Sequence, residues 1–95
     1  MKKISIIIPT YNEEKTIERV VNAVKTIQIP HYKKEIIVVN DASTDSTSLI
    51  INRLRKKLSY MRVINHKKNC GKGAAVITAL KYVTGEIAII QDADL

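Results

Sequence analysis

The 95-residue chain contains no tryptophan and no phenylalanine, and its only aromatic residues are four tyrosines. Isoleucine, valine, leucine and alanine must therefore fill the core of one domain or part of one. A single cysteine, Cys70, excludes an internal disulfide and is consistent with a reducing cytoplasm. No apolar run approaches the about 20 residues of a membrane-spanning helix. The first apolar stretch is too short for a signal peptide, because Pro9 interrupts it.

Acidic residues are in the minority. The 16 lysines and arginines outnumber the 9 aspartates and glutamates, which gives a formal charge of +7. This surplus favours nucleotides, other polyanions or anionic membrane surfaces as partners. The basic residues are scattered, however, and no aromatic residues lie between them to stack on bases, as single-strand binders require. A nucleic acid is therefore not an expected partner.

Short β-branched runs alternate with segments in which apolar residues recur at helical spacing. Strands are expected at residues 4–8, 36–39, 61–64 and 87–90. Continuous apolar strands between amphipathic helices predict an α/β fold, a mostly parallel open sheet of about four strands with helices on both faces. The helix residues expected to face inward are Ile17, Val20, Val21, Val24, Ile27, Leu49, Ile50, Leu54, Leu58, Val76, Ala79, Leu80 and Val83.

Several single residues have predicted local roles. Asn12 is placed to cap the first helix, and Gly85 is placed to end the third. Cys70 is expected to pack as a small apolar residue. His31 and His66 lie in lysine-rich loops, and neither has a predicted ligand role.

Chemically useful residues follow each expected strand. Open parallel sheets bind ligands outside the carboxyl ends of their strands, so these residues should meet at one rim. They are Pro9, Thr10, Tyr11 and Glu13 after the first strand, Asp41 after the second, Gly71, Lys72 and Gly73 after the third, and Asp92, Ala93 and Asp94 after the fourth.

Asp92 and Asp94 are the most informative pair on this rim. Residues i and i+2 of an extended segment point to the same side, so the two carboxylates face one point. They repel each other unless a cation or a donor lies between them. Hard oxygen ligands favour Mg²⁺ or Mn²⁺ completed by substrate phosphates. A solvated turn is the alternative for this pair taken alone.

The other rim residues also allow ordinary structural roles. A P-loop requires serine or threonine after its lysine, where Gly73 stands, and a dinucleotide fingerprint requires glycine or alanine in place of Val76. Lys72 can therefore be a solvated residue at a helix start. Asp41 alone fits a helix cap as well as a ligand role, and Tyr11 can cover the core edge or stack on a nucleobase.

Together, the stretches SIIIPTYNEE, IIVVNDASTDST, NCGKGAA and QDADL resemble the amino-terminal half of a family-two inverting nucleotide-sugar glycosyltransferase with the A-type fold. The third and fourth stretches most resemble the polyprenyl-phosphate branch, which includes dolichol-phosphate mannose synthase and its glucose-transferring relatives. The resemblance implies that residues 1–95 are a Rossmann-like, nucleotide-sugar-binding half-domain. Ala42 departs from the family pattern, which often has glycine there, and should restrict a positive φ.

The resemblance also implies the donor contacts. Tyr11 and the two residues before it would surround the nucleobase and ribose, Val39 and Asp41 would hold the base edge, and Lys72 would lie near the base or phosphates. Asp92 and Asp94 would hold Mg²⁺ or Mn²⁺ on the diphosphate of a UDP- or GDP-sugar. The implied contact residues are Pro9, Thr10, Tyr11, Glu13, Val39, Asp41, Lys72, Asp92, Ala93 and Asp94.

Family members are roughly twice this length or more, and an inverting transfer needs a general base. The resemblance places that base and the acceptor half beyond Leu95, so the chain is expected to bind a donor but to be inactive alone. The longer enzyme is expected in the cytoplasm, at the membrane face if its acceptor is a lipid phosphate.

Two other classes of function remain open. A non-catalytic nucleotide-binding or self-assembling module could share this fold, with homo-oligomers forming through exposed apolar surface. A phosphoacceptor signalling domain also gathers aspartates at strand ends. It is disfavoured because such domains normally add a fifth βα unit that carries a lysine.

Overall fold

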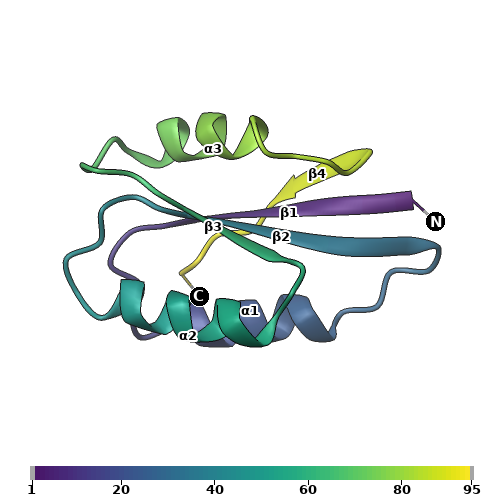
Figure 1. Cartoon of the computed structure of the whole chain (residues 1–95), viewed down its shortest axis with the longest axis horizontal. Helices are drawn as coiled ribbons and strands as arrows, with labels where there is room; N and C mark the ends of the chain where they lie inside the picture. Colours follow the sequence, from purple (N-terminus) through teal and green to yellow (C-terminus); the bar gives the residue numbers. More distant parts are fainter. Residues whose placement is uncertain (1, 95) are drawn as a thin grey trace.

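The computed structural model describes residues 2–94 as a four-stranded, all-parallel sheet with helices on both faces (Figure 1). This arrangement confirms the predicted α/β class. None of the described helices is both long and apolar enough to cross a membrane. The elements in chain order are β1 (Lys2–Thr10), α1 (Ile17–Thr26), β2 (Tyr32–Asn40), α2 (Thr47–Lys57), β3 (Met61–Asn65), α3 (Lys72–Leu80) and β4 (Ile87–Ile90).

The strand order, β3-β2-β1-β4, changes direction at β1. The chain steps outward from β1 to β3 and then returns to place β4 on the other side of β1. Right-handed crossovers in opposite directions put their helices on opposite faces, so α1 and α2 cover one face and α3 covers the other (Figure 1). The carboxyl ends of β1 and β4 therefore border a topological switch point, where sheets of this kind bind ligands.

The core has one apolar layer on each face of the sheet. Ile6 and Ile8 point toward α1 and α2, whereas Ile7 between them packs on the α3 side. There it meets Ala75 and Ala79, whose small side chains let α3 lie close to the strands. The alternation of β1 residues between the two layers is the period of two that a strand imposes.

Three residues expected to face inward are exposed instead. Ile27 is 55% exposed because α1 ends at Thr26, one residue earlier. Leu49 is 78% exposed because α2 buries the stripe that includes Ile51 and Leu54 instead. Leu80, the last residue of α3, is 54% exposed. For Leu49 and Leu80 the error arises because α2 and α3 carry apolar residues on more than one face, and periodicity alone does not choose the buried one.

The edge strand β4 is also less buried than expected. Ile87, Ile89 and Ile90 are 43%, 45% and 53% exposed. Among the described strands, β4 pairs with β1 alone, so its outer edge carries unpaired backbone groups beside apolar side chains. The expectation of strands covered on both faces is therefore wrong for β4.

Gly85 does not end α3, which stops at Leu80, but lies against the start of β1. Its N–H donates to Ser5 Oγ over 2.9 Å. A Cβ at this position would lie 2.6 Å from Ser5 Oγ, 2.8 Å from the Lys3 carbonyl oxygen and 2.9 Å from the Ser5 nitrogen. The two backbone atoms belong to a paired strand and cannot easily move away. Only glycine fits this close approach.

Gly85→Ala should therefore lower the free energy of unfolding by about 1–3 kcal/mol, the usual cost of overpacking. Urea unfolding followed by circular dichroism measures this change. Gly73→Ala is the matched control, because a Cβ there has no neighbour within 4 Å and alanine favours the α3 helix. Equal stability of wild type and Gly85→Ala would contradict the packing argument.

Candidate functional site

A cavity of about 460 Å³ opens at the carboxyl ends of the strands. It lies at the switch point between β1 and β4, where the topology predicts a ligand site. Of the predicted donor contacts, all except Val39 line it. The lining residues are Pro9, Thr10, Tyr11, Glu13, Asp41, Asn69, Gly71, Lys72, Ala75, Asp92, Ala93 and Asp94.

Val39 lies in the core instead of the cavity. Its side chain is fully buried and belongs to the apolar layer of Ile37, Ala75 and Ala79 beneath α3. It precedes Asn40 and Asp41, so its packing fixes the end of β2 from which Asp41 emerges. The structure thus gives the Val39 side chain a supporting role and no contact with the cavity.

The end of β1 forms one wall of the cavity. Pro9 and Thr10 are buried, and the Thr10 hydroxyl donates back to the Ile8 carbonyl over 3.1 Å. Tyr11 follows them and is 44% exposed. The buried pair thus holds an aromatic ring at the mouth of the cavity, where a planar group could stack on it.

The segment after β4 is held against the start of α1. Ala93 is buried in the core, and its carbonyl accepts a hydrogen bond from Thr16 Oγ1 over 2.7 Å. Thr16 Oγ1 also lies 3.2 Å from Glu13 Oε2. Because Ala93 points inward, its exposed neighbours Asp92 and Asp94 both point outward into the cavity, as their spacing predicts.

Asp92 and Asp94 already attract a cation within the chain. Lys72, the first residue of α3, contacts the Asp92 carboxylate with its ammonium group. The hydrogen bond and charge of Asp92, together with the charge of Asp94, raise the pKa of Lys72. Both side chains of the pair are more than half exposed, so an ion from solvent can reach the carboxylates. Their hard oxygen atoms fit Mg²⁺ or Mn²⁺.

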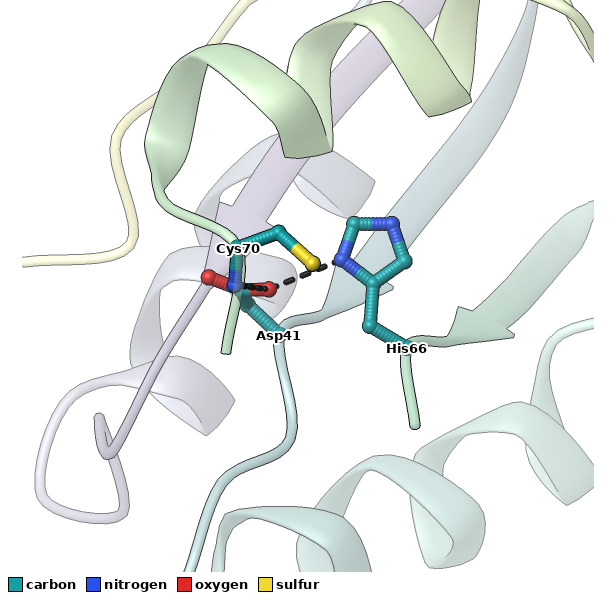
Figure 2. Close-up of side chains that lie close together, drawn as sticks. All are labelled: Asp41, His66 and Cys70. Carbon is teal, nitrogen blue, oxygen red and sulfur yellow. Dashed lines mark hydrogen bonds and ion pairs between the residues drawn. The ribbon is translucent and has the colours of Figure 1, made fainter. Parts of the chain in front are cut away.

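Asp41 is the polar centre of the opposite wall, and its side chain is almost fully buried (Figure 2). Its Oδ1 lies 2.8 Å from His66 Nδ1 and accepts from the Cys70 N–H over 2.9 Å. Its Oδ2 accepts from the Gly71 N–H over 2.8 Å and from Asn69 Nδ2 over 3.1 Å. Four donors match the acceptor capacity of a carboxylate. Asp41 therefore holds the loop between β3 and α3 in place.

The same donors determine the charge of Asp41. Burial by itself raises the pKa of a carboxyl group. Here the hydrogen bonds from His66 and from the N–H groups of Cys70 and Gly71 outweigh burial, so the pKa of Asp41 lies below its usual value. Asp41 is therefore an acceptor-only anion at neutral pH.

His66 is the residue beside the candidate site that the sequence reasoning missed. It follows the last residue of β3, Asn65, and so occupies the same rim position after its strand that Asp41 occupies after β2. Its Nε2 lies 2.8 Å from the Thr78 hydroxyl of α3, while its Nδ1 faces Asp41. The sequence contains a signal for this position, because a third strand one residue longer than predicted places His66 directly on the rim.

Cys70 is exposed, and its thiol donates to the Lys68 carbonyl over 3.2 Å. The prediction that it packs as a small apolar residue is therefore wrong. Figure 2 shows the Cys70 side chain near Asp41 and His66. Each of the three residues has one atom that could bind a metal ion, and these atoms lie within 4.8 Å of one another. In the described structure Asp41 and His66 are joined directly by a hydrogen bond.

Two residues with left-handed backbone join the loops after β1 and β2. Asn12 has φ 51° and does not cap α1, which begins at Ile17. Its Oδ1 accepts from the Thr44 N–H over 2.7 Å and links the two loops. Ala42 has φ 60°, so this loop adopts a positive φ despite its side chain. Alanine in this conformation stores local strain beside the site.

Comparison with known proteins gives a consistent result. A family model described as "Glycosyl transferase family 2" matches residues 5–95. Dolichyl-phosphate beta-glucosyltransferase ALG5C of Trichomonas vaginalis (strain ATCC PRA-98 / G3) is 35% identical over 96 residues, covering 95% of this chain and 28% of that protein.

Solved structures match as well. Staphylococcus aureus TarS 1-349 in complex with UDP-GlcNAc has a TM-score of 0.86 and 38% identity, over 97% of this chain and 26% of that one. The mannosyltransferase PcManGT from Pyrobaculum calidifontis, in complex with GDP-Man and Mn²⁺, has a TM-score of 0.88 and 35% identity, over 96% of this chain and 27% of that one.

The chain spans only part of these proteins, between about 15 and 30% of the length of the curated relatives. Within that span, the fold matches glycosyltransferase structures that are in complex with nucleotide-sugars. The match covers nearly the whole chain and rests on both sequence and structure. The chain belongs to glycosyl transferase family 2.

Proposed function

We propose that the cavity binds a nucleoside-diphospho-sugar, a UDP- or GDP-sugar, as the donor site of an inverting glycosyltransferase. The observation that supports this most is the convergence of Tyr11, Lys72 and the pair Asp92 and Asp94 on one cavity at the switch point. An aromatic face suits a nucleobase, and a lysine at a helix start suits a phosphate. Solved relatives are in complex with UDP-GlcNAc and with GDP-Man and Mn²⁺.

In this proposal the donor lies across the cavity. The base and ribose lie near Pro9, Thr10 and Tyr11, and the diphosphate lies near Lys72 and the pair Asp92 and Asp94. Asp41 is charged and could accept from a ring N–H, but four donors of its own chain already occupy it. Its main contribution is then to hold the wall that the base contacts.

Asp92 and Asp94 would hold Mg²⁺ or Mn²⁺ in this site. Their exposed carboxylates already face a cation, the Lys72 ammonium, and a divalent ion would compete with it for Asp92. When bound, the metal would neutralise the charge that develops on the departing nucleoside diphosphate. Lys72, once released from Asp92, would be free to approach the phosphates.

The acceptor side of the reaction is part of the same proposal. An inverting displacement needs a general base beside the acceptor hydroxyl, and we place that base outside residues 1–95. These residues alone should then bind the donor without transferring sugar. We further propose a polyprenyl phosphate acceptor and a site of action at the cytoplasmic membrane face. Sugar transfer by the purified 95-residue chain, or a water-soluble product of the longer enzyme, would contradict these assignments.

Isothermal titration calorimetry tests the donor site directly. UDP and GDP are titrated into the chain with and without Mn²⁺, and one of them should bind more tightly with the metal. CMP and AMP serve as controls for non-specific attraction to a chain of charge +7. Failure of both nucleoside diphosphates to bind in the presence of Mn²⁺ would contradict the proposal.

The exposed edge of β4 favours one alternative, a self-assembling module. Ile87, Ile89 and Ile90 present apolar surface beside unpaired backbone groups, which a second copy could cover. Sedimentation equilibrium over a range of concentrations, read together with the nucleotide titration, distinguishes a self-assembling module from a donor-binding domain. A dimer that binds neither nucleotide supports assembly, whereas a nucleotide-binding monomer contradicts it.

A further inference from the structure

His66 lies behind the donor cavity, between Asp41 and α3, and is not among the residues that line the cavity. Its Nδ1 is 2.8 Å from Asp41 Oδ1, and its Nε2 is 2.8 Å from Thr78 Oγ1. The side chain is 13% exposed. An imidazole with a partner at each nitrogen has a fixed ring orientation and a defined tautomer.

We propose that His66 is a positioning residue for donor binding, which fixes the direction of the Asp41 carboxylate and thereby the wall that receives the nucleobase. The inference rests on the proposed function, since it assigns a role within the same donor site. His66 would affect affinity without touching the donor.

The surroundings of the ring assign its tautomer. Asp41 is an acceptor-only anion, so the proton of a neutral imidazole must be on Nδ1. The Nε2 atom then accepts from the Thr78 hydroxyl. The Cys70 thiol also lies near the ring, but its hydrogen bond is to the Lys68 carbonyl. A proton on Nε2 alone would set an Nδ1 lone pair against the carboxylate.

The bond from His66 differs from the other three bonds to Asp41. Cys70, Gly71 and Asn69 all belong to the turn that precedes α3, and they can move together with it. Of these donors only His66 lies outside the turn, on the residue that follows β3, and its ring is held in place by Thr78 of α3. Without the bond from His66 the turn stays attached to Asp41, but the carboxylate loses the donor that ties it to the end of β3. The base end of the cavity should loosen, while the diphosphate end stays intact.

Three substitutions separate the two bonds of the ring. In His66→Asn the amide nitrogen can replace Nδ1 and reach Asp41, but it cannot reach Thr78. In His66→Gln the longer amide can replace Nε2 and reach Thr78, but it cannot reach Asp41. His66→Ala removes both bonds. A purely space-filling role would favour glutamine, which is the larger side chain, whereas the proposal favours asparagine.

The readout is calorimetric titration of the preferred nucleoside diphosphate and of inorganic pyrophosphate, each with Mn²⁺. His66→Gln and His66→Ala should bind the nucleotide about tenfold more weakly, the usual effect of losing a hydrogen bond to a charged group. The nucleotide affinity of His66→Asn should remain within about threefold of the wild-type affinity. Pyrophosphate affinity should be unchanged in all three, because it reports only on the diphosphate end.

Two results would overturn the proposal. One is wild-type nucleotide affinity in a folded His66→Gln protein, and the other is an equal loss of pyrophosphate affinity. The ¹⁵N spectrum of the His66 ring provides a test without any ligand: in the neutral ring the proton must be found on Nδ1, and a proton on Nε2 instead contradicts the inference. If wild type binds no nucleotide, the proposed function fails, while this spectrum still tests His66.

Discussion

Asp94→Asn removes the strengthening of nucleotide binding by Mn²⁺. In the wild-type chain Asp92 is partly neutralised by Lys72, whereas no hydrogen bond to the Asp94 carboxylate is found among the described residues. Asp94 is therefore the carboxylate most available to an incoming ion. Asparagine keeps the shape but halves the oxygen donors and removes the charge that hard cations require. The metal-dependent gain in affinity should fall by about 10–100-fold. Substituting a residue that only hydrogen-bonds to a metal ligand already weakens metal binding by about this factor.

The measurement is the Mn²⁺ dependence of the nucleoside diphosphate dissociation constant. Glu86→Gln is the matched control, because Glu86 is an exposed carboxylate that lies just before β4, at the opposite end of that strand from Asp94. It should leave the metal dependence unchanged. An Asp94→Asn protein in which Mn²⁺ still strengthens binding as in wild type would show that the ion is held elsewhere.

The strands were predictable because each has a centre rich in isoleucine and valine, but their ends were not. β1 and β2 both continue through polar residues, from the pair Lys2 and Tyr32 to the pair Thr10 and Asn40. The ladder of backbone hydrogen bonds between two adjacent parallel strands extends them past their apolar centres. No pattern within one segment reveals where a partner strand ends.

The helices were predictable in number and position, whereas their buried faces were only partly so. The prediction that α1 buries the face from Ile17 to Val24 is confirmed, because the other face of this helix is mostly polar. In α3 both faces carry apolar residues, and it is Ala75 and Ala79 that pack against the sheet while Leu80 is exposed. Close approach of the helix to the strands favours small side chains. Sequence spacing does not contain that information.

The candidate site was largely predictable because the rule about carboxyl strand ends depends only on element order. Asp92 and Asp94 converge as predicted, since Ala93 between them is anchored in the core. The network around Asp41 was not predictable. Its donors, from His66 to Gly71, are 25 to 30 residues away in sequence, and only the placement of β3 beside β2 brings them together.

The second large effect follows from this network. Asp41→Asn should lower the free energy of unfolding by about 2–4 kcal/mol. The amide nitrogen of asparagine would face donors where a carboxylate oxygen now accepts, so at least two N–H groups near the cavity wall would lose their acceptor. Each buried donor left without a partner costs about 1–3 kcal/mol. The remaining oxygen can satisfy only one side of the network.

The substitution should also change how stability depends on pH. Because the folded pKa of Asp41 is depressed, its stabilising contribution is complete above the unfolded pKa of about 3.9 and is lost as the pH falls through the folded value. Asparagine does not titrate, so this part of the acid sensitivity disappears. Glu35 and Asp45 also have lowered pKa values, and their contributions to the acid sensitivity of stability remain in both proteins.

Urea unfolding at neutral pH and at several values below about pH 4 measures both effects. The stability gap between wild type and Asp41→Asn should be widest near neutral pH and should narrow as the solution becomes more acidic. Asp92→Asn is the matched control, because Asp92 is a half-exposed carboxylate on the same rim and should change stability by no more than about 0.5 kcal/mol. A gap that stays constant across this range would show that Asp41 is not the charged centre of the loop.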